Sequence, residues 1–496
     1  MVEQFKKRIF GRGAAYIYIE TIASLISGYI FWIVMSKITT TESIGISSTL
    51  FSLAGIVAVV ASIGIPTGIQ RFLGKSFSDK KLDEAKTLVT VALFLICMGI
   101  AACSIVILIA QNWIDNIFDF DLELILVAIL FIGSSILFML FRSVVIASLK
   151  TKSLPIIIIS SSIVKLILTV VLLLIGTGTV GLTIGFTSNY VLSSILLGIF
   201  VMRTIFKSSS TSNLVVRFIA ISKSILVSSI VYWIPLLITT IGSQLGTIVV
   251  FGSQGADQAG VYFLTLTIVT GITSVMNSLF TIALPTLSGL SDYRKRFAWR
   301  AIRFSAIILL PFSCSLIFYS KEVMRLFGQN YISGSSSLEI LLLSMLPMAV
   351  LTGINTLVYS YGNYRDVLMI GLAVSIPRTL LYFLLVPIYG GGGAAIGYTV
   401  GSIIGCFVSL GIARKIGMHI LWKELGIIFI IPSTLAYFLE HYQVNFILGI
   451  VTATAFSYVI LLKIRIVTSS DVQDLLVILP ESLSKRLSKL VNKLGI

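Results

Sequence analysis

Charged residues are scarce in this chain, and acidic residues are scarcer than basic ones. Charged side chains make up 11% of the 496 residues, with 36 Lys and Arg against 20 Asp and Glu. A soluble domain carries about 25% charged residues, so this composition excludes one. The hydrophobic content of 57% and the mean hydropathy of +1.04 instead indicate a polytopic membrane protein.

Histidine and cysteine are also rare, which argues against metal and disulfide chemistry. The two histidines, His419 and His441, stand far apart in the sequence. The four cysteines lie inside apolar runs without paired spacing, which is typical of small buried hydrophobic residues; they are Cys97, Cys103, Cys314 and Cys406. We therefore expect neither a metal site nor a cofactor.

Long apolar runs dominate the sequence, and each is long enough to cross a bilayer, which takes about 20 residues. About 14 such runs fall at 14–36, 44–69, 87–110, 124–148, 154–176, 180–202, 224–250, 259–286, 304–320, 336–361, 366–388, 394–413, 424–440 and 445–462. We predict an all-α membrane protein with about 14 transmembrane helices. The runs leave no room for a large domain outside the membrane.

Basic residues are distributed unevenly between the connections. When alternate connections are assigned to the side of the N-terminus, nearly all Lys and Arg fall on that side, and the opposite side holds only Lys37, Lys321 and Arg325. This positive-inside pattern predicts a protein of the plasma membrane with both termini in the cytoplasm. Segment Pro480–Ile496 predicts a basic amphipathic helix on the inner membrane surface, with partner binding as the alternative.

Two cations belong to neither side, because they lie near the middle of apolar runs. Lys165 stands within run 154–176 and Arg378 within run 366–388. A cation at mid-bilayer costs about 2.5–3.5 kcal/mol on insertion scales, so such residues are usually functional. Their corresponding places in the two halves of the chain suggest one paired cationic site for an anionic ligand.

The two halves also share sequence motifs. Leu174–Thr187 and Pro387–Thr399 both link two spans by a glycine-rich turn and continue as Ile-Gly-aromatic-Thr. Gly64-Ile-Pro-Thr67 corresponds to Ala283-Leu-Pro-Thr286, and every pair is separated by about 210 to 220 positions. Six spans with their loops fill that distance, which predicts two six-helix halves related by an axis along the membrane normal.

The repeat predicts four parts of the chain. They are an N-lobe at 1–210 with spans 1–6, a C-lobe at 211–415 with spans 7–12, two extra spans at 416–463, and a cytoplasmic amphipathic tail at 464–496. In transporters with parallel repeats the binding site lies between the repeats.

Three segments resemble the polysaccharide-biosynthesis flippases of the multidrug/oligosaccharidyl-lipid/polysaccharide exporter superfamily. They are the turn Val386-Pro-Ile-Tyr-Gly-Gly-Gly-Gly-Ala-Ala395, the segment Leu326-Phe-Gly-Gln-Asn-Tyr331, and the stretch Gly64-Ile-Pro-Thr-Gly-Ile-Gln-Arg71. The resemblance implies two six-helix lobes, alternating access to the two sides of the membrane, and lipid-linked oligosaccharides as substrates. It supplies no catalytic signature, and we expect a transporter and not an enzyme.

The cations lead to a specific hypothesis. Lys165 and Arg378 line a cavity between the lobes and bind the phosphate or pyrophosphate of a lipid-linked sugar, since Arg offers a planar donor fork and Lys a compact charge. The alternative is structural, in which each cation pairs with helix carbonyls or a carboxylate. Arg71 and Arg142, at the inner ends of spans, either anchor in lipid or capture the substrate phosphate.

Other polar residues within spans are weaker candidates. Glu20 could bind a coupling proton or Na⁺, pair with one of the mid-membrane cations, or reach the inner surface. Asn189, Tyr232, Gln244 and Asn277 are possible cavity-lining residues, although hydrogen bonding between helices is the simpler interpretation for the amides.

The favoured function is a flippase for a polyprenyl- or dolichyl-linked oligosaccharide, working as a monomer with lipid-linked glycan as substrate. Candidate partners are membrane lipids and the glycan polymerase or glycosyltransferase machinery, and no nucleic acid is expected. A peptidoglycan-precursor flippase remains an alternative. A multidrug cation antiporter fits poorly, because Glu20 is the single acidic residue well inside a span. A membrane glycosyltransferase would need larger outer loops.

Overall fold

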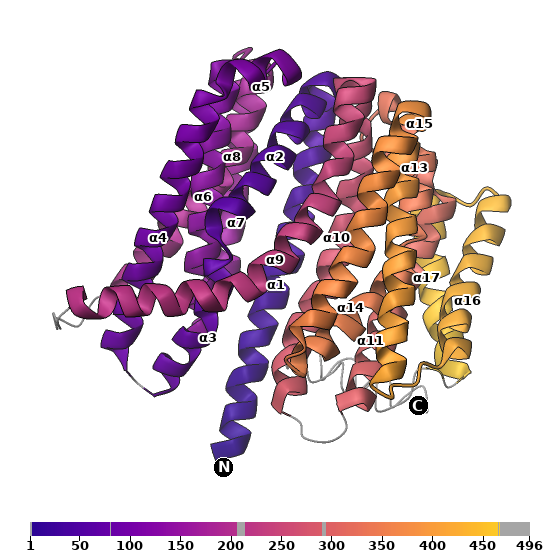
Figure 1. Cartoon of the computed structure of the whole chain (residues 1–496). Coiled ribbons are helices and arrows are strands. Elements are labelled where there is room, and N and C mark those ends of the chain that lie inside the picture. The colour runs from indigo at the N-terminus through magenta and orange to yellow at the C-terminus, as the bar shows by residue number, and fades with distance from the viewer. Residues whose placement is uncertain (1, 80, 206–213, 290–293, 465, 467–496) are drawn as a thin grey trace. The chain divides into compact units, whose positions relative to one another are not determined.

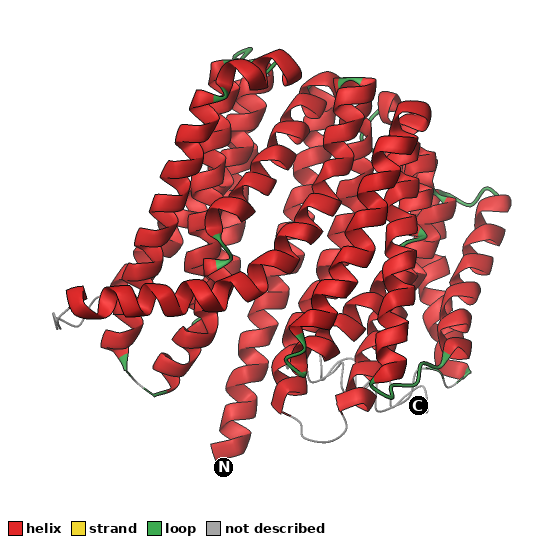
Figure 2. Cartoon of the chain, viewed as in Figure 1, coloured by secondary structure: helices red, strands yellow, loops and turns green. Residues whose placement is uncertain are grey.

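The computed structural model describes residues 2–79, 81–205, 214–289, 294–464 and 466. Across these residues the chain consists of helices joined by short connections, with no β-strand (Figure 2). The all-α prediction is therefore confirmed. The predicted amphipathic tail helix, Pro480–Ile496, lies outside the described residues.

The number of spans agrees with the prediction. Twelve helices in the described part of the chain are long and apolar enough to cross a membrane, and the pair Gln329–Leu342 and Met345–Ser360, bent by 44°, makes thirteen. Helix α15 (Tyr364–Lys415) has 52 residues and contains a break at Gly390. At 1.5 Å per residue it measures about 78 Å, more than twice the hydrocarbon core, so it represents two spans.

The chain forms two compact packing units (Figure 1). We call Ile22–Phe263 the first unit, and Met1–Thr21 together with Leu264–Ile496 the second unit. The boundaries fall within helices α1 and α10. The division of the lobes at residue 210 stays a prediction, because packing units and sequence repeats divide the chain by different criteria.

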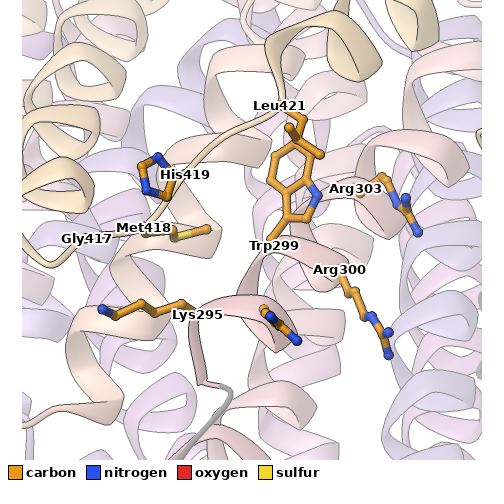
Figure 3. Close-up of a pocket in the computed structure, with 9 residues that line it drawn as sticks. Lys295, Trp299, Arg300, Arg303, Gly417, Met418, His419 and Leu421 are labelled. Carbon is orange, nitrogen blue, oxygen red and sulfur yellow. The ribbon is translucent and has the colours of Figure 1, made fainter.

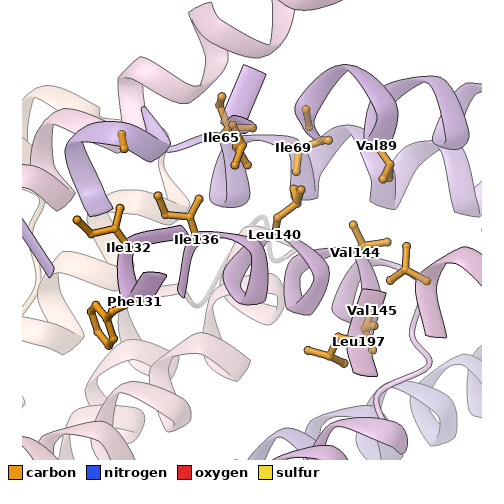
Figure 4. Close-up of a cluster of buried hydrophobic side chains, with 14 of the residues drawn as sticks. Ile65, Ile69, Val89, Phe131, Ile132, Ile136, Leu140, Val144, Val145 and Leu197 are labelled. Carbon is orange, nitrogen blue, oxygen red and sulfur yellow. The ribbon is translucent and has the colours of Figure 1, made fainter. Parts of the chain in front are cut away.

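The first unit contains most of α1 and the helices up to α9. Their bounds are α1 (Val2–Ile38), α2 (Thr41–Ser62), α3 (Ile65–Ser78), α4 (Leu82–Ile109), α5 (Gln111–Phe118), α6 (Leu122–Ala147), α7 (Ser153–Leu174), α8 (Gly178–Ile205) and α9 (Leu214–Gln254). Aliphatic side chains of α2, α3, α4 and α6 form its buried core, in which Ile69, Val89 and Leu140 are fully enclosed (Figure 4).

The second unit contains the remaining helices. They are α10 (Ala256–Gly289), α11 (Arg294–Phe318), α12 (Ser320–Arg325), the 3₁₀ helix η1 (Gln329–Gly334), α13 (Ser335–Leu342), α14 (Met345–Ser360), α15, α16 (Trp422–His441) and α17 (Phe446–Lys463). Helix α11 packs against α14, α16 and α17. The hydroxyl of Tyr458 on α17 donates to the carbonyl of Ile308 on α11 at 2.8 Å.

The second predicted span is shorter than the run 44–69 suggested. Helix α2 ends at Ser62, because Ile63 and Gly64 adopt positive φ angles of 47° and 67°, and α3 then begins with Pro66 in its first turn. Proline favours a helix start, where its missing N–H is not needed. Arg71 therefore lies on the separate helix α3 rather than at the end of the second span.

Helix α9 packs closely on this break. The indole Nε1 of Trp233 donates to the carbonyl of Val59 at 2.8 Å. A side chain at Gly64 or Gly68 would collide with Ser229 on α9, so both glycines permit close approach of the helices. Helix α9 also contains Pro235 and bends along its length (Figure 1).

Two of the motifs that resemble the flippase family have structural roles at turns. In Leu326–Tyr331, Gly328 has a φ of 133° and the aromatic rings of Phe327 and Tyr331 are buried. In Val386–Ala395, Gly390 has a φ of 55° and breaks the long helix. Such positive φ angles favour glycine, so these motifs specify chain reversals.

Candidate functional site

Lys165 is buried in the interior of the first unit. It lies midway along α7, and its side chain is 5% exposed. The ammonium Nζ stands 4.5 Å from the ring centre of Phe31 on α1 and 5.4 Å from that of Phe186 on α8. Within the described residues it makes no ion pair or hydrogen bond. An ammonium in this position is stabilised by the negative faces of the rings alone.

The aromatic surroundings of Lys165 are extensive and come from several helices. Phe186 contacts the rings of Phe31 at 5.7 Å, Trp32 at 5.6 Å and Phe51 at 4.4 Å. These side chains come from α1, α2 and α8. Because offset and tilted ring pairs fix each other's orientation, the rings form a rigid apolar cage around one charge.

Arg378 is equally buried, at 4% exposed, but its guanidinium is engaged by the protein itself. Its Nε donates to the backbone carbonyl of Tyr398 at 3.2 Å, and one Nη donates to the hydroxyl of Ser402 at 2.7 Å. The guanidinium carbon lies 3.7 Å from the ring centre of Tyr398. Arg378 therefore joins the two halves of α15 that meet at the break.

The two cations occupy corresponding places in the two repeats. Lys165 lies over Phe186, the aromatic residue of the first Ile-Gly-aromatic-Thr motif, and Arg378 lies over Tyr398, that of the second. Each motif therefore places its ring under a cation of the preceding span.

The glycines of the two motifs correspond as well. A side chain at Gly185 would overlap Thr169, and one at Gly397 would overlap Tyr382, which stands one turn after the cation in each span. The hairpin geometry is thus the same in both halves, which supports the six-plus-six repeat predicted from the sequence.

The chemistry of the two copies differs. Arg378 uses its donors to hold a hairpin together, so the structural interpretation applies to it directly. Lys165 keeps an ammonium that lies over two rings and makes no hydrogen bond or ion pair among the described residues. Its neighbourhood on α8 also contains Asn189, one turn beyond Phe186, whose side-chain Oδ1 is buried and accepts no hydrogen bond in the described structure.

Hydroxyl pairs surround this part of the first unit. Ser193 on α8 donates to Ser161 on α7 at 2.7 Å, and Ser27 on α1 donates to Ser162 at 3.2 Å. Such pairs hold membrane helices together at close approach. Lys165 therefore lies on a helix that is fixed on both sides by neighbouring spans.

The remaining candidate residues are scattered over both units. Glu20 is 5% exposed in the first half of α1, and it takes part in an interaction of its own. Arg142 is half-buried near the end of α6 and also has a partner. The side chain of Arg71 lies outside the described part of the structure.

The candidate cavity-lining residues lie on three helices, α8, α9 and α10. The Ser52 hydroxyl on α2 lies 3.5 Å from Oε1 of Gln244 on α9, at the limit of a hydrogen bond between helices. Tyr232 is half-buried on α9, and Asn277 is exposed on α10. Among the described residues, no group of His, Cys, Asp or Glu has the arrangement of a metal site.

Sequence reasoning missed two features. It did not anticipate the aromatic cage of Lys165, although Phe186 belongs to the repeated motif that it identified. It also assigned the basic stretch Arg294–Arg303 to membrane topology alone, whereas five of its residues line a pocket of about 620 Å³. The signal for the pocket was the spacing of cations and Trp299 on one helix face.

Several solved membrane-protein structures share the fold of this chain. The lipid II flippase MurJ in an inward closed conformation superposes with a TM-score of 0.65 at 16% identity, covering 90% of this chain and 97% of MurJ. An inward-facing multidrug resistance MATE transporter of the MOP superfamily superposes with a TM-score of 0.59 at 16% identity. This match covers 81% of this chain and 94% of the transporter. At these identities the comparisons establish a shared fold.

A third solved structure has the same fold. It is a MOP superfamily transporter from Pyrococcus furiosus, for which the reverse polarity of the binding pocket is said to suggest a different function. Its TM-score is 0.58 at 14% sequence identity, and the match covers 82% of this chain and 95% of that transporter. No curated protein sequence matches the chain significantly. A family profile described as "Polysaccharide biosynthesis protein" matches residues 34–335. Because this match spans more than half of the chain, the chain belongs to the polysaccharide biosynthesis protein family.

Proposed function

We propose that the protein is a flippase that moves a polyprenyl- or dolichyl-(pyro)phosphate-linked oligosaccharide across the membrane by alternating access. Membership of the polysaccharide biosynthesis family supports a glycan substrate. The shared fold with a lipid II flippase and with MATE transporters supports a transport role. Lys165 is the residue that we assign to the substrate phosphate.

The observation that carries the proposal is that the buried Lys165 ammonium has ring contacts but no hydrogen bond or ion pair among the described residues. A cation at mid-bilayer costs about 2.5–3.5 kcal/mol, and a cation–π contact returns about 0.5–2 kcal/mol. The nearer ring, at 4.5 Å, thus returns less than the cost, and the ring at 5.4 Å is close to the outer limit of such a contact. A phosphate oxygen would supply the missing partner, and charge-assisted hydrogen bonds of this kind are the strong ones.

Arg378 has a supporting role in this proposal. Its bonds to Tyr398 and Ser402 keep the hairpin of α15 rigid, while its charge contributes a positive potential in the second unit. Glu20, a buried carboxyl group, is the residue that we propose for binding a coupling proton or Na⁺. Its replacement by Gln would remove the dependence of transport on an ion gradient.

A peptidoglycan precursor is the second candidate substrate. The observation in its favour is the similarity to the lipid II flippase MurJ, which covers 90% of this chain, compared with 81% for the MATE structure. Both candidates carry a phosphate group on a lipid, so Lys165 would serve either. A direct comparison of the two lipids in the same transport assay separates them.

The test is reconstitution of the full chain in liposomes with a fluorescent lipid-linked oligosaccharide in the inner leaflet. Translocation is followed by quenching with a membrane-impermeant reagent. Lys165→Gln is expected to slow translocation about 10- to 100-fold, because a charged hydrogen bond contributes about 1.5–3 kcal/mol. Lys37→Gln is the matched control, since Lys37 is exposed at the end of α1.

The outcome decides the role of Lys165 in either direction. Slow translocation by the Lys165 variant, with normal translocation by the Lys37 variant, supports phosphate binding. Translocation at the wild-type rate by both variants would refute it. Transport of a peptidoglycan precursor in preference to the oligosaccharide would replace the first substrate by the second.

A further inference from the structure

A basic pocket lies in the second unit, where α11 meets the connection between α15 and α16. It has a volume of about 620 Å³ and is lined by Lys295, Arg296, Trp299, Arg300, Arg303, Gly417, Met418, His419 and Leu421 (Figure 3). All of these residues belong to one packing unit. Among the described residues, the lining contains four Lys and Arg residues and no acidic residue.

The positive charge comes from successive turns of one helix. Arg296, Arg300 and Arg303 stand four and three positions apart on α11, which places them along one face, and Lys295 precedes Arg296 directly. Lys295 and Arg296 also lie in the first turn of the helix, where the backbone dipole favours a bound anion. Glu424 pairs with Arg303 at 3.2 Å, and Arg296 also takes part in an interaction. Lys295 and Arg300 are exposed.

Gly417 shapes one wall of the pocket. Its φ of 77° is unfavourable for a residue with a side chain. A Cβ atom there would lie only 3.2 Å from the Lys295 ammonium, so glycine lets the backbone approach the charge closely. Figure 3 shows Lys295 on the side of Met418 and His419, while Arg300 and Arg303 lie on the other side of Trp299.

The pocket is amphipathic as well as basic. Trp299, Met418 and Leu421 add apolar surface beside the cations (Figure 3). Two candidate spans, Arg294–Phe318 and Trp422–His441, begin beside it, which places the pocket at one surface of the membrane. Tryptophan is enriched at that level of a bilayer.

These properties together identify a ligand class. A free phosphate ion would need the cations but no apolar wall, whereas a phospholipid offers both a phosphate and an acyl region. Basic pockets between membrane helices are known to hold anionic lipid headgroups. We propose that this pocket binds the phosphate headgroup of an anionic phospholipid from the leaflet at which α11 and α16 begin.

The bound lipid would link two elements of the second unit. Helix α11 packs along α16 and α17, and the pocket joins its first turns to the chain entering α16. A headgroup that contacts both sides holds α11 against this connection. The proposal thus adds a lipid-dependent clamp to the second unit, and it does not require Lys165 or the identity of the transported glycan.

The experiment uses the full chain in phosphatidylcholine nanodiscs with added phosphatidylglycerol. Binding is measured by native mass spectrometry and by the rise in melting temperature. Each basic residue near an anionic lipid contributes about fivefold to affinity, so Lys295→Ala with Arg300→Ala is expected to weaken phosphatidylglycerol binding about 30-fold. The single variant Arg300→Gln is expected to weaken it about fivefold.

A matched control removes two cations elsewhere. Lys150 and Lys152 are exposed in the connection between α6 and α7, so their double replacement by Ala makes the same change in net charge. We expect this control to bind phosphatidylglycerol like the wild type. Melting in phosphatidylcholine alone shows whether the variants fold, and Arg300→Gln serves if the double variant does not.

Three results would overturn the proposal. The first is phosphatidylglycerol binding that the pocket variants leave unchanged. The second is equal weakening by the Lys150 and Lys152 control, which would indicate general surface charge. The third is stabilisation by inorganic phosphate that matches phosphatidylglycerol and depends on Lys295 and Arg300, which would assign the pocket to a free phosphate ion.

Discussion

The two mid-membrane cations are expected to respond in opposite ways to the same substitution. Replacing Lys165 by Met should stabilise the fold, whereas replacing Arg378 by Met should destabilise it. Both side chains are buried, and both lie over the ring of the same repeated motif. The difference comes from what the protein offers each charge besides that ring.

For Lys165, the cost of burying the charge exceeds the stabilisation that its ring contacts provide. Its insertion cost of about 2.5–3.5 kcal/mol is offset chiefly by the ring at 4.5 Å, which returns about 2 kcal/mol. Methionine has a similar length and fills irregular apolar space well. We expect Lys165→Met to raise the free energy of unfolding by about 0.5–1.5 kcal/mol, which is the difference between the cost and the return.

For Arg378 the balance favours the charge. Two charged hydrogen bonds at about 1.5–3 kcal/mol each and a ring contact at about 0.5–2 kcal/mol exceed the insertion cost of about 2.5–3.5 kcal/mol. Methionine would lose the bonds to the Tyr398 carbonyl and the Ser402 hydroxyl. We expect Arg378→Met to lower the free energy of unfolding by about 1–4 kcal/mol, on the same values.

The measurement is reversible unfolding in mixed detergent and sodium dodecyl sulfate micelles, with Lys37→Met as an exposed control expected to change stability by less than about 0.5 kcal/mol. A stabilised Lys165 variant that has also lost translocation would show that the lysine is kept for function at the expense of stability. Equal destabilisation by both substitutions would refute the reasoning, because it would mean that Lys165 has a protein partner as effective as that of Arg378.

Two further predictions concern helix contacts in the first unit. Gly185→Ala should cost about 1–3 kcal/mol through overlap with Thr169, whereas Gly28→Ala, with open space around it, should raise the melting temperature slightly. A higher melting temperature for both variants would contradict the tight α7–α8 contact. Trp233→Phe should cost about 0.5–1.5 kcal/mol by removing the hydrogen bond to Val59, and unchanged thermal unfolding would show that this bond contributes nothing.

The general architecture could be predicted because a bilayer imposes simple rules on sequence. Apolar length marked the spans, and the spacing of the two Ile-Gly-aromatic-Thr motifs revealed the repeat. The break after α2 was not predicted, because the sequence remains apolar across it. Gly64 and Pro66 are the residues in the sequence that indicate it. Hydrophobicity alone does not distinguish a continuous span from two helices joined by residues with positive φ.

The partners of the cations were harder to predict, since they depend on which side chains of neighbouring helices face each other. The sequence placed Arg378 and Ser402 in adjacent spans, but a register change of one residue would have turned Ser402 away. The same limit applies to Lys165, whose ring contact Phe31 comes from a helix far away in the sequence. The basic residues of α11 could be recognised in the sequence. They form a pocket only because the chain at Gly417 lies against them in the folded structure.

The repeat preserves the geometry of the two hairpins while their chemistry has diverged. In each half, a glycine lets the second helix approach the first, and the next residue places a ring beneath a cation. In the second half, Ser402 and the Tyr398 carbonyl satisfy that cation. In the first half, the corresponding face of α8 carries Asn189, whose buried oxygen accepts no hydrogen bond among the described residues.

A buried donor and a buried acceptor without partners among the described residues are each costly, and a fold selected only for stability would remove both. Lys165 and Asn189 are the donor and the acceptor concerned. A phosphate that bears a hydroxylated sugar offers acceptor oxygens to the first and donor hydroxyls to the second. Under the proposed function, such a ligand would satisfy both groups in the first half, whereas the second half satisfies its own cation with Ser402 and the Tyr398 carbonyl.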